Sequence, residues 1–291
     1  MKYTVNENSV ILTDYDSFSV SQTLECGQCF RFFKIAEENY VVIAFGRILN
    51  IYENEDGIVF AGTSETEFND RWKAYFDLDR DYRKIKDKIS ENDEILKKAV
   101  EYAPGIRILN QDRFECLISF IISQNNRIPM IKKVIDNISR KYGKLIGTFE
   151  GTEFYAFPSP EELAMADEKG LMECKCGFRA KYIMDAVDKV LGKKIKLDDD
   201  DMDTDSLRNM LMTIKGVGPK VADCTMMFSF GRCETFPTDV WVKRIMSELY
   251  FDGREASVKE IHKKADDCFG EYAGYAQQYL FNYARQFKIG A

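Results

Sequence analysis

The sequence predicts an α+β protein in which an N-terminal antiparallel β-sheet is followed by helices. Short runs rich in Val, Ile, Phe and Tyr, separated by turn residues, fill much of the chain up to Ala61. Helical spacing of apolar residues begins near Thr66 and dominates the rest of the chain. Pro104-Gly105 is typical of a boundary, so we expect a sheet domain with flanking helices over residues 1–104 and a helical domain over residues 105–291.

The predicted sheet consists of antiparallel hairpins. Glu37–Asn39, Gly46-Arg47 and Asn54–Gly57 supply turn residues between β-branched and aromatic runs. The expected strands are residues 17–24, 29–35, 40–45, 48–53 and 57–61.

The helical domain carries clear helix-start signals. Ser159-Pro160 with Glu162, and Ser257 with Glu260, have the pattern of capping boxes. Residues 112–123 are apolar on most of their surface, which predicts a buried helix. The acidic run 198–205 is expected to be a solvated linker into the next helix. The other expected helices are residues 127–141, 179–191, 204–214, 219–230, 238–250 and 272–287.

Bulk composition limits the class of protein. The chain has 291 residues, of which 45% are hydrophobic and 31% charged, as in ordinary globular proteins. No apolar run is long enough to cross a bilayer, and Met1–Glu7 lacks the apolar core of a signal peptide. We therefore expect a soluble cytoplasmic protein, and a monomer because heptads and spare apolar helix faces are missing.

Cysteine and histidine usage argues against several chemistries. The eight cysteines, in a chain without an export signal, are expected to be reduced thiols. The CxxC of Cys26 and Cys29 has only His262 to complete a zinc site that needs about four ligands. No cysteine follows Cys268, which excludes an iron–sulfur cluster held by closely spaced C-terminal cysteines. His262 is expected on the exposed flank of a helix, and we expect neither a metal nor an organic cofactor.

The net charge of −7 argues mildly against binding of nucleic acid. The charge is unevenly distributed, however, because residues 198–205 carry six acidic side chains. From Arg208 to Arg244, six Lys or Arg side chains outnumber three acidic ones. This locally positive segment is compatible with a phosphate-binding face.

Gly216–Gly218 form a tight turn between two helices with apolar stripes. The two glycines allow positive φ angles and close approach of a partner to the backbone. The N–H groups that begin the second helix, together with its dipole, favour a phosphate at this turn. A helix–turn–helix corner without a ligand is the alternative, and the GxG pattern alone does not decide between them.

Two residues near this turn carry reactive groups. Lys220 lies in the first turn of the second helix, either as a solvated surface residue or as an amine nucleophile activated by the helix N-terminus and by burial. Asp239, which follows Phe236–Thr238, either caps the next helix or supplies a carboxylate to a reaction. Each residue alone favours the structural interpretation. A phosphate-binding loop, an amine and a carboxylate together indicate chemistry on a nucleic-acid sugar.

These segments resemble the helix–hairpin–helix DNA glycosylase superfamily, and more closely its 8-oxoguanine DNA glycosylase/AP lyase family. The motifs occur in the family's order and cover nearly the whole chain. The matching segments are ECGQCFR at 25–31, FIISQNN at 120–126, GFRAK at 177–181, GVGPKVADC at 216–224, PTDV at 237–240 and AQQYLF at 276–281.

The resemblance implies a role for each matching residue. Lys220 would attack C1′ of a flipped-out nucleotide, expel the base and hold the sugar as a Schiff base until β-elimination nicks the strand. Asp239 would stabilise the cationic sugar. The remaining implied contacts are the Gly27 carbonyl with the N7–H of 8-oxoguanine, Gln277 with the Watson–Crick edge, Phe281 and Cys224 with the two base faces, Asn125 in the vacated gap, Phe178 and Arg179 beside the orphaned base, and the Gly216 and Gly218 turn at the phosphate.

Two positions depart from the family pattern. Met130 stands where eukaryotic members carry a second arginine that reads the opposite cytosine, and Met donates no hydrogen bond to a base edge. We therefore expect weak selectivity for cytosine opposite the lesion. Trp241 stands where a phosphate-contacting His is common; its indole can donate one N–H or stack.

The implied partner is duplex DNA containing 8-oxoguanine, and the resemblance leaves open whether a monovalent cation binds at the hairpin carbonyls, as in the superfamily. Two alternatives remain open at this point. One is a glycosylase for another lesion, such as an alkylated base; Lys220 counts against it because the alkylpurine branch lacks the catalytic lysine. The other is a non-catalytic helix–hairpin–helix DNA-binding protein, which needs neither a Lys220–Asp239 pair nor a pocket.

Overall fold

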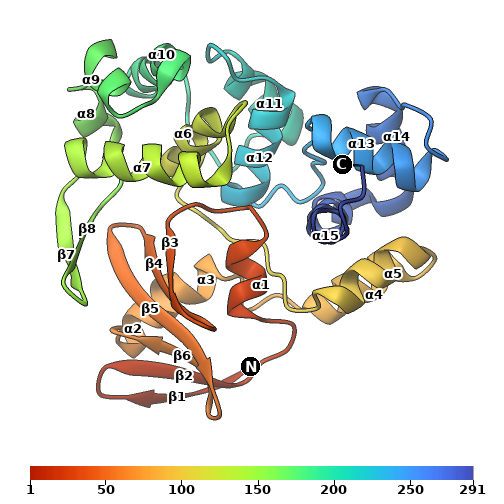
Figure 1. Ribbon diagram of the computed structural model, residues 1–291, viewed down its shortest axis with the longest axis horizontal. Coiled ribbons are helices and arrows are strands. Elements are labelled where there is room, and N and C mark those ends of the chain that lie inside the picture. Colours follow the sequence, from red (N-terminus) through yellow and green to blue (C-terminus); the bar gives the residue numbers. More distant parts are fainter. Residues whose placement is uncertain (291) are drawn as a thin grey trace.

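The computed structural model describes residues 1–290 and consists of a six-stranded sheet beside a larger group of helices (Figure 1). The strand order is β1-β2-β6-β5-β4-β3, and every neighbouring pair is antiparallel. The predicted α+β class is confirmed. The strands are β1 (Lys2–Asn6), β2 (Ser9–Asp14), β3 (Phe32–Ala36), β4 (Asn39–Ala44), β5 (Arg47–Asn54) and β6 (Gly57–Ala61).

The strand predicted over residues 17–24 is wrong, because this segment forms helix α1 (Val20–Glu25). Ser19 caps the helix by accepting a hydrogen bond from the Gln22 N–H, and Thr23 and Leu24 are buried together with Val20. Their spacing is that of a helix face that packs under a sheet, so the helical period outweighs β-propensity here.

Two hairpins lie outside the predicted strands. β1 and β2 form one edge of the sheet, and β2 pairs with β6. β7 (Leu145–Phe149) and β8 (Thr152–Tyr155) form a separate two-stranded hairpin after helix α7 (Ile128–Tyr142). The strand predicted from residue 29 begins later, at Phe32.

The predicted helices are present, with ends shifted by one or two residues in most cases. Both predicted capping boxes, at Ser159 and Ser257, are confirmed, and the acidic run is an exposed linker whose Asp203 caps the next helix. The helices that follow the sheet are α2 (Glu65–Glu67), a π-helix (Phe68–Trp72), α3 (Lys73–Tyr75), α4 (Tyr82–Ser90), α5 (Glu94–Tyr102), α6 (Arg113–Ser123), α7 (Ile128–Tyr142), α8 (Pro160–Leu163), α9 (Glu168–Glu173), α10 (Ala180–Leu191), α11 (Thr204–Met212), α12 (Pro219–Ser229), α13 (Val240–Tyr250), α14 (Val258–Phe269) and α15 (Ala273–Phe287).

Apolar residues form one large core in the sheet part and another in the helical part. The helical core also takes in side chains from α4 and α5, such as Tyr82, Ile85 and Leu96. In Figure 1 these two helices lie to the right of the sheet and below α15. The boundary at Pro104-Gly105 stays a prediction, since α4 and α5 precede it in the chain but pack with the helices that follow it.

All eight cysteines are free, and seven of them are buried. Within residues 1–290, no helix combines the length and apolarity needed to cross a membrane. In the same part of the chain, His, Cys, Asp and Glu side chains form no group of three or more that could hold a metal ion.

A buried ion pair joins the segment before β3 to α6. Arg31 Nη1 lies 3.5 Å from Glu115 Oε2, and the two side chains are 8% and 16% exposed. Burial raises the pKa of Glu115 to about 7, against the smaller opposing effect of the Arg31 guanidinium. The folded protein therefore keeps a proton on Glu115 in a pH range where an unfolded glutamate is ionised.

We expect Glu115→Gln to flatten part of the pH dependence of the free energy of unfolding. Folded Glu115 binds its proton more tightly than the unfolded carboxyl, so its contribution is complete below the ordinary pKa of 4.5 and is lost as the pH rises through about 7. The difference is worth at most about 3 kcal/mol. Urea unfolding at about pH 5 and about pH 8 should show a larger loss for wild type than for the variant. Equal losses in the two proteins would contradict this assignment.

Candidate active site

The candidate site lies where α12 and α13 begin. Lys220 is the second residue of α12 and is half-buried, with its Nζ 5.2 Å from the centroid of the Phe120 ring. Asp239 caps α13, and its Oδ1 accepts the Val242 N–H at 2.8 Å. The second carboxylate oxygen, Oδ2, accepts no hydrogen bond from any residue in the range 1–290. Asp239 can therefore cap the helix and still present one free oxygen.

An inner cavity of about 60 Å³ opens beside these two side chains. Its walls come from α6, α12, α13 and α15, and from the loop after α1. They include Lys220, Asp239 and all four residues predicted to bind the base, namely Gly27, Cys224, Gln277 and Phe281.

A more open outer cavity of about 500 Å³ adjoins it. Asn125 and Gly218, predicted to contact DNA, line this outer cavity together with Thr238. Lys220 and Asp239 line both cavities, and they are the two residues that the walls share. An amine and a carboxylate thus stand at the passage between an inner and an outer space. A larger hollow of about 760 Å³, lined by Phe45 and Arg113 among others, contains none of the predicted site residues.

The loop after α1 presents the carbonyl group of Gly27. Arg285 donates to the Glu25 carbonyl at 2.6 Å, Gln278 to the Cys26 carbonyl at 2.8 Å, and Gln111 to the Gln28 carbonyl at 2.8 Å. The Gly27 carbonyl, between them, accepts no hydrogen bond within the described part of the chain. Gly27 has φ +94°, and a Cβ there would lie 3.3 Å from the Phe281 ring, so the position favours glycine.

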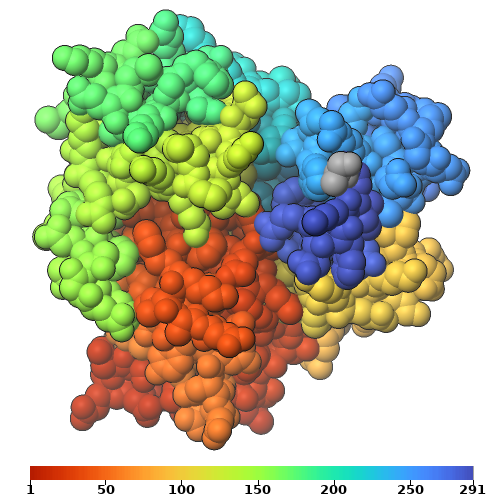
Figure 2. Space-filling view, viewed as in Figure 1, coloured from red at the N-terminus to blue at the C-terminus, as the bar shows by residue number. Residues whose placement is uncertain are grey.

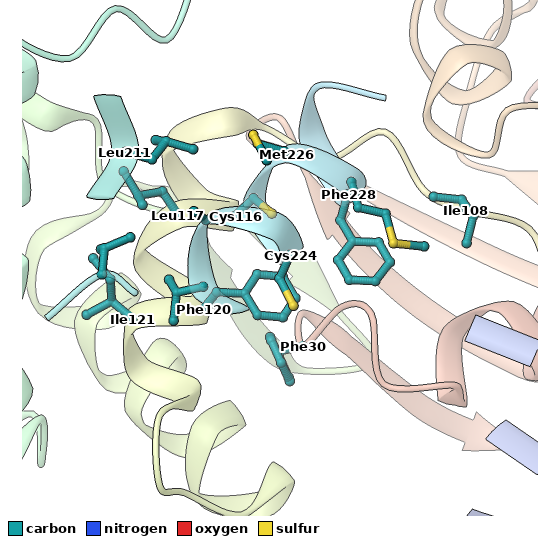
Figure 3. Packing of buried hydrophobic residues seen from close by; sticks show 14 of the residues in the cluster. Phe30, Ile108, Cys116, Leu117, Phe120, Ile121, Leu211, Cys224, Met226 and Phe228 are labelled. Atoms are coloured by element: carbon teal, nitrogen blue, oxygen red, sulfur yellow. The ribbon is translucent and has the colours of Figure 1, made fainter. Parts of the chain in front are cut away.

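Three side chains complete the inner cavity. Gln277 is 6% exposed, and its buried Oε1 has no hydrogen-bond partner among residues 1–290. Burial raises the pKa of the Cys224 thiol to about 11, so it presents a neutral sulfur. Cys224 lies close to Phe120 and Phe228 in the apolar packing of α6 and α12 (Figure 3). Phe281 is half-buried on α15, whose surface adjoins that of the N-terminal part in Figure 2.

The two hairpin glycines have different functions in the fold. Gly216 has φ +76°, and a Cβ there would lie 2.3 Å from the ring of Tyr182, so both the conformation and the space exclude a side chain. Gly218 has φ −99° and caps α12 in an extended conformation, which corrects the expectation of positive φ at both glycines. A Cβ at Gly218 would meet nothing within 4 Å. The open space at Gly218 lies on the wall of the outer cavity.

The turn after α6 carries Asn125, which is exposed and has φ +47°. Arg179 is 8% exposed and donates to the carbonyl groups of Gln124 and Asn125, at 2.8 Å from Nε and 2.9 Å from Nη2 respectively. In this structure the Arg179 guanidinium thus fixes the turn through these two carbonyl groups. The predicted contact between Arg179 and the orphaned base stays a prediction. Phe178 is 54% exposed, with the Arg179 guanidinium 4.5 Å from its ring centroid.

Three further residues complete the comparison with the sequence. Met130 is exposed near the start of α7, and Trp241 is half-buried but lines neither cavity. The expected exposed position of His262 is wrong, because the side chain is half-buried and its Nε2 lies 3.1 Å from Thr238 Oγ1. No local signal marks His262 or Arg285 as neighbours of the site, since both contacts join distant segments.

Comparison with known proteins identifies related sequences. The N-terminal domain of 8-oxoguanine DNA glycosylase matches residues 10–117, and the HhH-GPD superfamily of base excision DNA repair proteins matches residues 118–270. A probable N-glycosylase/DNA lyase of Methanothermobacter thermautotrophicus is 34% identical over 72% of this chain and 72% of its own length. The N-glycosylase/DNA lyase of Saccharomyces cerevisiae is 31% identical over 90% of this chain and 76% of its own length.

A solved structure extends the similarity to the whole fold. The 8-oxoguanine glycosylase/lyase of Clostridium acetobutylicum, in complex with double-stranded DNA containing cytosine opposite 8-oxoG, is 42% identical. The alignment has a TM-score of 0.95 and covers 99% of each chain. A shared fold, both matched domains and relatives more than 30% identical lead to one conclusion: the chain belongs to the 8-oxoguanine DNA glycosylase/lyase family of the HhH-GPD superfamily.

Proposed function

We propose that this protein removes 8-oxoguanine from duplex DNA and then nicks the strand, with Lys220 as the nucleophile and Asp239 as its electrostatic partner. The observation that carries the proposal is the position of these two residues at the passage between the inner and outer cavities. With the inner cavity widened from about 60 Å³ to admit a purine, a base held there and its strand along the outer cavity would place the connecting sugar beside both side chains. The base must leave the helix stack to reach this position.

The chemistry proceeds in two steps. The lone pair of the Lys220 amine forms a bond to C1′ while the C1′–N9 bond breaks and its electron pair leaves with the base. Asp239 Oδ2, which is free of other hydrogen bonds, stabilises the positive charge that develops on the sugar. Loss of a proton and opening of the ring give an imine between Lys220 and C1′. Removal of a C2′ proton then breaks the C3′–O bond, and the strand is cut by β-elimination.

Recognition of the damaged base depends on one donor. 8-Oxoguanine carries an N7–H, whereas guanine has a lone pair at N7, and the free Gly27 carbonyl matches only the former. The unpartnered Gln277 Oε1 is suited to accept from the N–H groups of the Watson–Crick edge. Cys224 and Phe281 supply neutral, apolar contacts to the two faces. A site of this kind rejects analogues that lack the required hydrogen.

DNA outside the cavities would contact the hairpin and the Asn125 turn. The N-terminus of α12 and the open space at Gly218 suit a backbone phosphate. Asn125 is exposed and suited to fill the gap left by the flipped base, and the exposed Phe178 is suited to lie beside the orphaned base. The carbonyl oxygens of Lys215, Gly216 and Val217 accept no hydrogen bond within the described residues, so they fit a monovalent cation that would neutralise phosphate charge.

Two other interpretations are weaker. A glycosylase for alkylated bases leaves Lys220 at the passage without a function, and a DNA-binding module leaves the cavity and its unpartnered Gln277 unexplained.

We further propose that the protein acts on DNA as a monomer in the cytoplasm.

The covalent step predicts that borohydride traps the protein on a duplex containing 8-oxoguanine, because it reduces the imine to a stable amine. Lys220→Gln should abolish trapping and strand cleavage, since glutamine has no basic amine. Asp239→Asn should reduce cleavage by roughly a hundredfold or more, within the range observed for loss of one electrostatic contact in an active site. Gel analysis of trapped complexes measures both effects, with unmodified guanine duplex as control. Cleavage by Lys220→Gln, or no trapping by wild type, would contradict the mechanism.

The hairpin glycines predict two separable effects. Gly216→Ala should destabilise the fold, because the new Cβ collides with Tyr182 at a positive φ. Gly218→Ala should leave the melting temperature nearly unchanged but weaken DNA binding, because its Cβ meets no protein atom and enters the outer cavity. Thermal melts and affinity for a duplex with a reduced abasic site distinguish the two variants. Wild-type affinity in Gly218→Ala would refute phosphate contact at this residue.

Met130 predicts similar rates of excision whichever base lies opposite the lesion. Its thioether cannot donate a hydrogen bond, so it provides no direct reading of cytosine. Single-turnover rates on duplexes with C, A, G or T opposite 8-oxoguanine measure the selectivity. Met130→Arg should raise the preference for cytosine relative to wild type, because it adds donors at this exposed position. A strong preference of the wild-type protein for cytosine would refute the prediction.

A further inference from the structure

The segment that carries Asp239 into the site is held by few polar contacts. Phe236–Thr238 makes no backbone–backbone hydrogen bond within the described chain. Its start is fixed at Thr235, whose side chain donates to the Arg232 carbonyl at 2.8 Å. Its end is fixed only where Asp239 caps α13. The Thr238 side chain therefore supplies the polar anchor between these two points.

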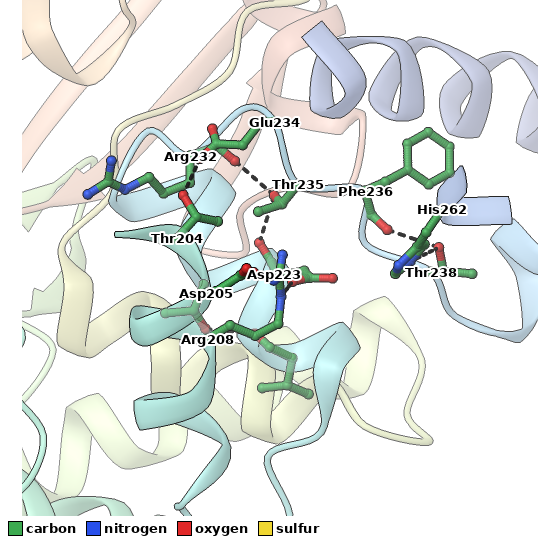
Figure 4. Close-up of polar contacts among 12 residues, drawn as sticks. Thr204, Asp205, Arg208, Asp223, Arg232, Glu234, Thr235, Phe236, Thr238 and His262 are labelled. Atoms are coloured by element: carbon green, nitrogen blue, oxygen red, sulfur yellow. Dashed lines mark hydrogen bonds and ion pairs between the residues drawn. The ribbon is translucent and has the colours of Figure 1, made fainter. Parts of the chain in front are cut away.

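Thr238 is anchored by the single histidine of the chain (Figure 4). Thr238 Oγ1 donates to the Phe236 carbonyl at 2.9 Å and lies 3.1 Å from Nε2 of His262 on α14. A hydroxyl has one proton, and here the Phe236 carbonyl receives it. Thr238 Oγ1 thus offers only a lone pair to the ring, so Nε2 must carry the hydrogen and act as the donor.

We propose that His262 is a positioning residue for Asp239: its Nε2–H fixes the Thr238 hydroxyl, and this fixes the backbone that aims the Asp239 carboxylate at the passage between the cavities. The inference rests on the proposed role of Asp239. Pro237 and Asp239 line the inner cavity, and Thr238 and Asp239 line the outer cavity. A small rotation of this segment would therefore move the free Oδ2 away from the sugar. Misplacement by about 1 Å is enough to cost on the order of a hundredfold in rate.

The first test separates positioning from binding. His262→Met and Thr238→Val each remove the contact while retaining similar size, and each should lower the maximal single-turnover rate of excision by about tenfold or more. For His262→Met, the enzyme concentration that gives half-maximal rate should change little, because this side chain lines neither cavity. His262→Gln keeps an N–H donor near the Nε2 position and should recover most of the rate. Loss of rate in His262→Gln equal to that in His262→Met would overturn the proposal.

Coupling between the two residues provides the second test. If they act through one hydrogen bond, His262→Met combined with Thr238→Val should be no slower than the slower single variant. Multiplicative losses would overturn the proposal. All rates are measured well below each variant's melting temperature, so a variant that is only less stable keeps its rate. If wild type is active and these variants match it, the inference fails while the proposed function stands; if wild type is inactive, the proposed function fails.

The third test needs no activity. Because the chain has one histidine, a long-range ¹H–¹⁵N spectrum of the ¹⁵N-labelled protein reports His262 alone. We expect the pattern of a ring protonated at Nε2, and we expect Thr238→Val to shift the Nε2 signal. A neutral ring protonated only at Nδ1 would overturn the assignment of donor and acceptor.

Discussion

The arrangement of the site depends on a helix that is buried on every side except its first turn. Residues Val221–Ser229 of α12 are all buried, whereas Pro219 is exposed and Lys220 is half-buried. Phe228 of α12 stacks on Phe120 of α6 with ring centroids 5.5 Å apart, deep in the packing that Figure 3 shows. Because the interior is close-packed, the helix cannot rotate without disturbing its neighbours. Lys220 therefore projects from a rigid element, as a reacting group requires.

A buried ion pair fixes the same helix against the preceding one. Asp223 on α12 is 1% exposed, and its Oδ1 lies 2.7 Å from Nε of Arg208 on α11. Burial raises the pKa of Asp223, and the Arg208 hydrogen bond opposes this shift. Figure 4 shows the pair beside the connection from α12 to α13. Removing Arg208 is expected to cost up to about 3–5 kcal/mol, because it leaves the buried Asp223 carboxylate unpaired. The ion pair thus fixes the two helices of the hairpin relative to each other.

The sequence predicted those features that depend on local interactions. The capping boxes at Ser159 and Ser257, the buried helix after Asp112 and the hairpin at Gly216 all follow from residues within one or two turns. Most inner-cavity residues were predicted because several motifs together resemble a known family, whereas their individual patterns favour ordinary core or surface positions. The strand predicted over residues 17–24 was wrong. The alternation of residue types there resembles a strand, but Val20, Thr23 and Leu24 form the buried face of a helix that begins after Ser19.

The remaining features depend on contacts that local patterns do not encode. Strand β1 is mostly exposed and polar, and its place in the sheet is set by pairing with β2 at the sheet edge. The local sequence around His262 predicts only that it lies on a helix. Its contact with Thr238 arises from the way α14 packs in the fold. Arg179 similarly lies beneath the Asn125 turn because two distant segments meet there. For such residues, only the assembled fold identifies the partner.

The packing of the two parts of the molecule also determines how base selection can work. Gly27 belongs to the N-terminal part, whereas Lys220 and Asp239 belong to the helical part, so base recognition and chemistry must be aligned across their contact. The free Gly27 carbonyl would attract the N7–H of 8-oxoguanine and repel the N7 lone pair of guanine. This repulsion discriminates only if the carbonyl cannot turn away, because a mobile group would avoid an unfavourable contact. The bonds that hold the neighbouring carbonyls of Glu25, Cys26 and Gln28 remove that freedom. Under the role proposed for Gly27, selectivity for one hydrogen atom would depend on the rigidity of a loop whose anchors come largely from α15, the helix that also carries Gln277 and Phe281.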